Sequence, residues 1–258
     1  MKTDWPMGTV QPIGVAAGFS SLLLITVPVQ LFIVLIAPRF RHVLPKWVFG
    51  TAARLMGAKL QIRGDPPKSG PLLIAANHVS WIDIIAIGAT VPCFFVAKRD
   101  VRSWPVFGPL ARLLQTCFVD RERRSAVGPV RQEMMERFEQ GHILVLFPEG
   151  TSTDGRQVLE FKSALFPGDG LTIQPLTVRY SDEGGRDGAH YGWYGDMELL
   201  PHMWAVFKGR PFQVDLIFHA PLAPREGQTR KDQAACAEQI VREGLALAPK
   251  GAKETSQT

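Results

Sequence analysis

The sequence predicts an α/β fold, in which a mostly parallel sheet is flanked by helices and preceded by an N-terminal membrane helix. Three short apolar runs, 71–76, 93–97 and 143–146, have the length of buried strands, and stretches with helical periodicity separate them. Continuous apolar runs are typical of parallel strands that helices cover on both faces. The apolar segment 13–37 is longer than the roughly 20 residues that a membrane-spanning helix needs.

The apolar segment 13–37 is the predicted membrane anchor. It is too long for the core of a signal peptide, and four basic residues follow it: Arg39, Arg41, Lys46 and Arg54. By the positive-inside rule, the rest of the chain lies on the cytoplasmic side of the inner (cytoplasmic) membrane. A buried core helix is the alternative interpretation. Pro28, near the middle of the segment, also permits a bent helix that enters only one leaflet.

The chain divides into an anchor, a globular domain and a tail. Residues 1–57 contain the anchor and an amphipathic helix at 43–56, which lies either in the membrane interface or on the globular domain. Residues 58–248 form the domain, and the polar residues 249–258 are expected to be disordered. Further strands are predicted at 59–64, 116–119, 171–180 and 212–218, and further helices at 129–140, 199–207 and 232–247.

A histidine and an aspartate follow the apolar run 71–76. His78 lies on the predicted bend between this strand and the next helix, where α/β proteins place ligand-binding residues. Asp83 lies in the first helical turn, where it can reach back toward His78 and form a capping pair with Ser80. A neutral imidazole held by a carboxylate can take a proton from an alcohol near pH 7. His78 and Asp83 are therefore the candidate catalytic pair, although an ordinary loop histidine and a capping acid would give the same pattern.

A second motif follows the apolar run 143–146. Pro148 ends the strand, Gly150 permits a tight backbone, and Glu149 and Thr151 are left at the carboxyl end. Taken alone, the motif also fits a simple turn with an exposed acid.

Together, the two motifs resemble the glycerolipid acyltransferase family of the lysophosphatidic acid acyltransferase type, which includes lyso-ornithine lipid acyltransferases. The resemblance rests on Asn77-His78 through Asp83, followed by Phe147-Pro148-Glu149-Gly150-Thr151. Two weaker blocks appear in the family's order: Lys98-Arg99-Asp100 with Trp104-Pro105-Val106-Phe107-Gly108, and Ile173-Gln174-Pro175-Leu176-Thr177. The matching stretch runs from about residue 59 to about residue 220.

The resemblance implies an O-acyltransferase of membrane lipid biosynthesis. His78 would deprotonate the hydroxyl of a lyso-lipid, and the oxygen would attack the thioester of acyl carrier protein or coenzyme A, while Asp83 orients the imidazole. A thioester is already activated, so no metal or redox cofactor is expected. The residues expected to bind substrate are Glu149, Gly150, Thr151, Lys98, Arg99 and Arg121. Arg121 is included because the corresponding arginine of the family lies near the substrate phosphate.

One position departs from the family pattern. Members that acylate lysophosphatidic acid usually carry an arginine directly after Gly-Thr, where this chain has Ser152. Without that bidentate phosphate ligand, a phosphomonoester acceptor is less favoured. Either Arg99, Arg121 or Arg156 compensates, or the acceptor carries another head, such as the amino acid of a lyso-ornithine lipid. Both acceptors stay open.

Two other functional classes compete with the transferase. A lipid or thioester hydrolase would need an activated nucleophile, and the sequence has no Gly-x-Ser-x-Gly elbow. A non-catalytic basic membrane-binding protein would explain the net charge of +5 but not the histidine bend. Nucleic acid is not an expected partner, because the basic residues follow the motif loops and the membrane edge.

Overall fold

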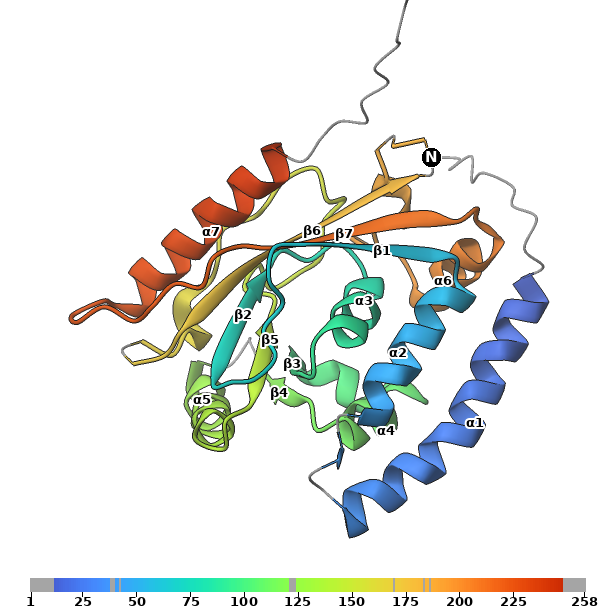
Figure 1. Cartoon of the computed structure of the whole chain (residues 1–258), viewed down its shortest axis with the longest axis horizontal. Helices are drawn as coiled ribbons and strands as arrows, with labels where there is room; N and C mark the ends of the chain where they lie inside the picture. Colours follow the sequence, from blue (N-terminus) through green and yellow to red (C-terminus); the bar gives the residue numbers. More distant parts are fainter. Residues whose placement is uncertain are drawn as a thin grey trace, which may run out of the picture.

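A seven-stranded sheet forms the centre of the protein (Figure 1). The computed structural model describes residues 12–37, 40–41, 43–120, 124–168, 170–182, 184–185 and 187–247, so the predicted tail 249–258 lies outside the described residues. The strands are β1 (Ala58–Arg63), β2 (Leu72–Ala76), β3 (Phe94–Lys98), β4 (Cys117–Val119), β5 (Ile143–Leu146), β6 (Ile173–Asp182) and β7 (Phe212–Phe218). Their order is β1-β7-β6-β2-β5-β3-β4, and every neighbouring pair is parallel except β6 with β7. The predicted mostly parallel sheet is confirmed.

Helices cover both faces of the sheet. They are α1 (Pro12–Ile36), α2 (Val43–Leu55), α3 (Ile82–Thr90), α4 (Phe107–Leu113), α5 (Arg124–Glu139), α6 (Leu199–Lys208) and α7 (Arg230–Leu247). On one face, Ile74 packs in a core to which α1, α2, α3 and α6 contribute. On the other face, its neighbours Leu73 and Ala75 pack against α5 and α7. Strand β2 is therefore buried on both sides, which is why its sequence is apolar throughout.

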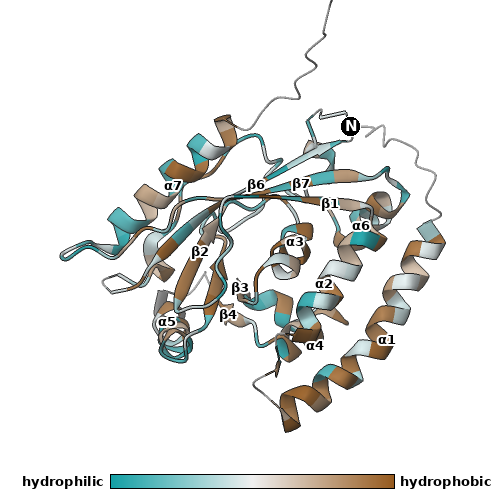
Figure 2. Cartoon of the chain, viewed as in Figure 1, coloured by the Kyte–Doolittle hydropathy of each residue, from teal (hydrophilic) through white to brown (hydrophobic). Residues whose placement is uncertain are grey.

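Helix α1 is long and apolar enough to cross a membrane, by length and composition, and most of its surface is not covered by the rest of the protein. It runs along the outside of α2, and its outward side is apolar over most of its length (Figure 2). Four α1 residues that face the protein are buried: Val15, Leu22, Thr26 and Gln30. The exposed side carries large apolar residues, such as Leu24, Phe32 and Leu35, which suit contact with lipid.

Helix α2 is an integral part of the globular core. Ala52 and Ala53 are buried, and the helix packs along α3. At that contact, a side chain on Gly88 would come within 2.4 Å of the Phe49 ring, so only glycine fits there. Trp47, on the other side of α2, is exposed. The helix predicted for 43–56 thus lies on the globular domain with one face and presents the other to the surroundings.

Candidate active site

The bend between β2 and α3 brings His78 to the carboxyl edge of the sheet. Asn77 fixes this bend, because its side-chain amide donates to the carbonyl of Val178 in β6 at 2.9 Å and accepts from the N–H of the same residue at 2.7 Å. The carbonyl of His78 accepts a hydrogen bond from the N–H of Thr153 at 2.9 Å. The bend is therefore held by β6 on one side, through Asn77, and by the loop after β5 on the other, through the carbonyl of His78.

His78 and Asp83 form the hydrogen-bonded pair that the sequence predicts. The distance from His78 Nδ1 to Asp83 Oδ2 is 2.7 Å. The same oxygen accepts the N–H groups of Val79 at 2.8 Å and Ser80 at 3.0 Å. Because Nδ1 is engaged with a buried carboxylate and the imidazole is 18% exposed, Nε2 is the nitrogen left to meet a substrate.

A tyrosine completes the support of this pair. Tyr180, in β6, donates its hydroxyl to Asp83 Oδ1 at 2.5 Å, and it is buried. Burial, together with the Asp83 charge, raises the pKa of this phenol well above its usual value, so the hydroxyl stays protonated as a donor. Both oxygens of Asp83 are thus paired, and the carboxylate plane is fixed against the imidazole. Sequence reasoning missed Tyr180, because nothing in a strand pattern marks which tyrosine meets an aspartate 97 residues away.

Ser80 does not cap α3 as predicted. The helix begins at Ile82 with Trp81 at its N-cap, where no side chain makes a capping hydrogen bond. The Ser80 hydroxyl is buried and has no hydrogen-bond partner among the described residues. Asp83 takes the capping role alone, because its carboxylate already binds the free N–H groups of the preceding turn.

Glu149 supports the catalytic bend from the turn that follows the neighbouring strand, β5 (Ile143–Leu146). Its Oε1 accepts the N–H of His78 at 2.6 Å and its Oε2 accepts the N–H of Leu159 at 2.7 Å. The residue is buried, and this burial raises the pKa of the carboxyl to about 7, against the lowering effect of the two N–H donors. Phe147 stacks on the imidazole of His78 with ring centroids 4.1 Å apart. A contact of Glu149 with the acceptor lipid stays a prediction, because both oxygens are used within the protein.

The other residues of the second motif lie beside this bend. Gly150 has a φ of 82°, a conformation that glycine adopts without strain, and its N–H donates to the Phe147 carbonyl at 3.3 Å. Thr151 is exposed, as a residue that meets a substrate must be. Ser152, at the position of the family's arginine, donates its hydroxyl to the carbonyl of Trp193.

Two of the three predicted basic residues are engaged with acids. Lys98 lies 2.7 Å from Asp100, and Arg99 lies 3.5 Å from Asp120, both in exposed ion pairs. Arg121 lies outside the described residues, so its place near the substrate stays a prediction. Within the described part of the chain, no group of three or more His, Cys, Asp or Glu side chains is arranged to hold a metal ion.

Comparison with known proteins identifies the family. The family model described as Acyltransferase matches residues 59–178. The lyso-ornithine lipid O-acyltransferase of Rhizobium meliloti (strain 1021) is 34% identical over 237 residues, which cover 86% of this chain and 81% of that protein. The 1-acyl-sn-glycerol-3-phosphate acyltransferase of Neisseria gonorrhoeae is 34% identical over 169 residues, 64% of this chain and 66% of that protein.

A solved structure shows the same fold. The crystal structure of the 1-acyl-sn-glycerophosphate acyltransferase from Thermotoga maritima superposes with a TM-score of 0.66 at 21% identity, and the match covers 90% of this chain and 93% of that one. The resemblance drawn from the two motifs is therefore confirmed, and the hydrolase and non-catalytic alternatives are set aside. The chain belongs to the acyltransferase family and is an acyltransferase of lyso-lipids in membrane lipid biosynthesis.

Proposed function

We propose that the protein transfers a fatty acyl group from an acyl thioester to the hydroxyl of a lyso-ornithine lipid, with His78 as general base. His78 Nε2 takes the proton of the acceptor hydroxyl, and the oxygen attacks the thioester carbonyl. Asp83 stabilises the imidazolium that forms. The tetrahedral intermediate then collapses, the carbon–sulfur bond breaks, and the imidazolium returns the proton to the leaving thiolate. The 2.7 Å contact between His78 and Asp83 supports these roles.

The choice of acceptor rests on the cations near the second motif. Ser152 occupies the position at which family members that bind phosphate carry an arginine, and its hydroxyl donates a hydrogen bond to the Trp193 carbonyl. Arg156 lies 2.6 Å from Asp187 and Arg99 lies 3.5 Å from Asp120, so each of these guanidinium groups already has a carboxylate beside it, which reduces its attraction for a phosphomonoester. The zwitterionic amino-acid head of a lyso-ornithine lipid needs no such cluster of free cations. This is the observation that carries the proposal.

Lysophosphatidic acid is the second candidate acceptor. The Neisseria relative acts on 1-acyl-sn-glycerol-3-phosphate by its name, and it is as identical to this chain as the Rhizobium relative is over the aligned residues. Lys98 and Arg121 are the residues that would then meet the phosphate, as a compact cation and a planar bidentate donor respectively.

We also propose the donor and the setting of the reaction. The donor is the thioester of acyl carrier protein or coenzyme A. Residues 1–57 hold the protein to the inner membrane, and the acyltransferase domain, 58–248, lies on the cytoplasmic side. The exposed apolar side of α1 and the basic residues after it, such as Arg41, support this orientation.

The acceptor is tested with purified protein, a labelled acyl thioester and each lyso-lipid supplied separately. The expected result is a higher kcat/KM for the lyso-ornithine lipid. Ser152→Arg should raise kcat/KM for lysophosphatidic acid over that of Ser152→Ala, which loses the same hydroxyl without adding a guanidinium. A wild-type preference for lysophosphatidic acid, or no difference between the two variants, would refute the proposed acceptor. Loss of both products in His78→Ala, with the circular dichroism spectrum retained, is the separate test of the chemistry.

A further inference from the structure

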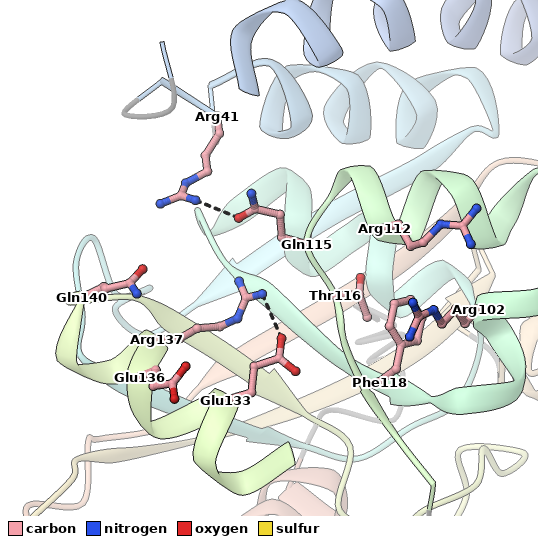
Figure 3. A pocket seen from close by; sticks show the side chains of 10 residues that line it. All are labelled: Arg41, Arg102, Arg112, Gln115, Thr116, Phe118, Glu133, Glu136, Arg137 and Gln140. Carbon is pink, nitrogen blue, oxygen red and sulfur yellow. Dashed lines mark hydrogen bonds and ion pairs between the residues drawn. The ribbon is translucent and has the colours of Figure 1, made fainter. Parts of the chain in front are cut away.

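Four arginines line a cavity of about 490 Å³ at the free edge of the sheet (Figure 3). They are Arg41 after α1, Arg102 after β3, Arg112 in α4 and Arg137 in α5. The cavity also contains the carboxylates of Glu133 and Glu136. Its lining residues do not include His78, Asp83 or Glu149. Most of them lie near the amino-terminal ends of β4 and β5, and Arg102 follows the carboxyl end of β3.

The arginines of this cavity are poorly neutralised. Glu133 lies 3.1 Å from Arg137, and Glu136 accepts a hydrogen bond from Gln132. In the part of the chain that the structure describes, Arg41, Arg102 and Arg112 have no ion pair with a carboxylate. Arg41 donates to the side chain of Gln115 at 2.8 Å.

Two of the guanidinium groups are held close together. Arg41 and Arg137 both lie over the ring of Phe94, at 5.7 Å and 4.7 Å from its centroid. Both also lower the pKa of His142, after the larger effect of burial, so this imidazole adds no charge near neutral pH. Because Arg137 is paired with Glu133, Arg41 contributes more than Arg137 to the positive potential of the cavity.

An apolar cleft of about 100 Å³ lies on the other side of α4. Its walls are apolar side chains of three helices, among them Val27 of α1, Val48 of α2 and Leu113 of α4. Helix α4 lies between the cleft and the arginine cavity, because Arg112 lines the cavity while Leu110 and Leu113 line the cleft. The outward side of α1 beside the cleft is apolar, with Ile36 68% exposed.

We propose that the arginine cavity and the apolar cleft form one binding site for an anionic phospholipid of the membrane, separate from the acceptor site. The phosphate lies beside Arg102 and Arg112, and the first part of an acyl chain lies in the cleft between α1, α2 and α4. The remainder of the chain continues along the exposed face of α1 into the bilayer. A single amphiphilic ligand that crosses α4 fits both cavities, because Arg112 on one side of this helix suits a lipid head and Leu113 on the other side suits its tail.

The test is native mass spectrometry of the full-length protein in detergent, titrated with phosphatidylglycerol or phosphatidylcholine. The wild-type protein should retain one phosphatidylglycerol in preference to phosphatidylcholine. The double variant Arg102→Gln/Arg112→Gln should bind phosphatidylglycerol about 30-fold more weakly, as expected for two basic side chains at an anionic lipid surface. Both side chains are exposed and form no ion pair with a described residue, so the fold should tolerate the change.

The control is Arg225→Gln/Arg230→Gln, which removes the same charge from exposed positions near α7. It should bind phosphatidylglycerol as the wild-type protein does. Equal weakening in both double variants, or no preference for phosphatidylglycerol in the wild type, would overturn the proposal. Inorganic phosphate that binds as tightly as phosphatidylglycerol, so that the lipid tail adds no affinity, would assign the cavity to a free anion instead. If the Arg102/Arg112 variant loses binding of apo acyl carrier protein but not of lipid, the cavity is a carrier-protein contact and the lipid proposal fails.

Discussion

Replacing Tyr180 with phenylalanine measures how much the hydrogen bond from its hydroxyl to Asp83 contributes to catalysis. The change removes only the hydroxyl that donates to Asp83 Oδ1, in a side chain that is 5% exposed. A hydrogen bond to a charged group contributes about 1.5–3 kcal/mol, and here its loss leaves a buried carboxylate oxygen without a donor. If the whole loss appears in the transition state, where the imidazolium forms, kcat falls roughly 10- to 150-fold.

The expected kinetic signature is a lower kcat with little change in KM for either substrate. Tyr180 lies behind Asp83 and makes no surface that a substrate reaches, so substrate binding should not depend on its hydroxyl. Initial rates at saturating thioester and acceptor measure the effect. Tyr191→Phe is the matched control, because Tyr191 is buried in the same aromatic cluster but its hydroxyl points to the carbonyl of Arg210 at 3.4 Å.

The reasoning is refuted if Tyr180→Phe has wild-type kcat, or if Tyr191→Phe loses as much activity as Tyr180→Phe. The first result would mean that Asp83 keeps its orientation through His78, Val79 and Ser80 alone. The second would mean that both tyrosines act only through packing.

Three further predictions concern the same region. Asp83→Asn keeps the size of the side chain but removes the charge that stabilises the imidazolium, so kcat should fall about 10³- to 10⁴-fold in initial-rate assays. Activity near the wild-type level would exclude Asp83 as the partner of the general base. Burial raises the pKa of Glu149 from 4.5 to about 7, so between these pH values the folded protein keeps a proton that the unfolded chain releases. The free energy of unfolding should therefore fall by about 3 kcal/mol as the pH rises from 4.5 to about 7. Glu149→Gln should abolish this part of the slope in denaturant titrations, and an unchanged slope would contradict the assignment. Gly88→Ala should destabilise the protein by about 1–3 kcal/mol in the same titrations, because the new methyl group meets the Phe49 ring. Ala89→Gly provides a comparison on the same helix. Equal stability of Gly88→Ala and the wild-type protein would show that Phe49 moves aside at no cost.

The sequence alone was sufficient for the parts of the protein that depend on local spacing. The apolar runs located the central strands because strands buried on both faces must be apolar along their whole length. The pair His78 and Asp83 was found because only four residues separate them across one bend, which leaves few possible geometries. The motif around Glu149 was placed at a strand end for the same local reason, and the family followed from the two motifs together.

Only the tertiary structure decided the contacts between distant segments. The strand order brings β6 beside β2, which sets Tyr180 under Asp83, and it brings β5 to the other side, which turns Glu149 inward onto the N–H of His78. The buried position of Glu149, and hence its raised pKa, follows from that packing and not from its neighbours in the chain. The arginine cavity likewise gathers side chains from four separate elements. Residue spacing encodes where a strand ends, but the order in which strands assemble depends on the summed packing of the whole core, and that order determines which side chains meet.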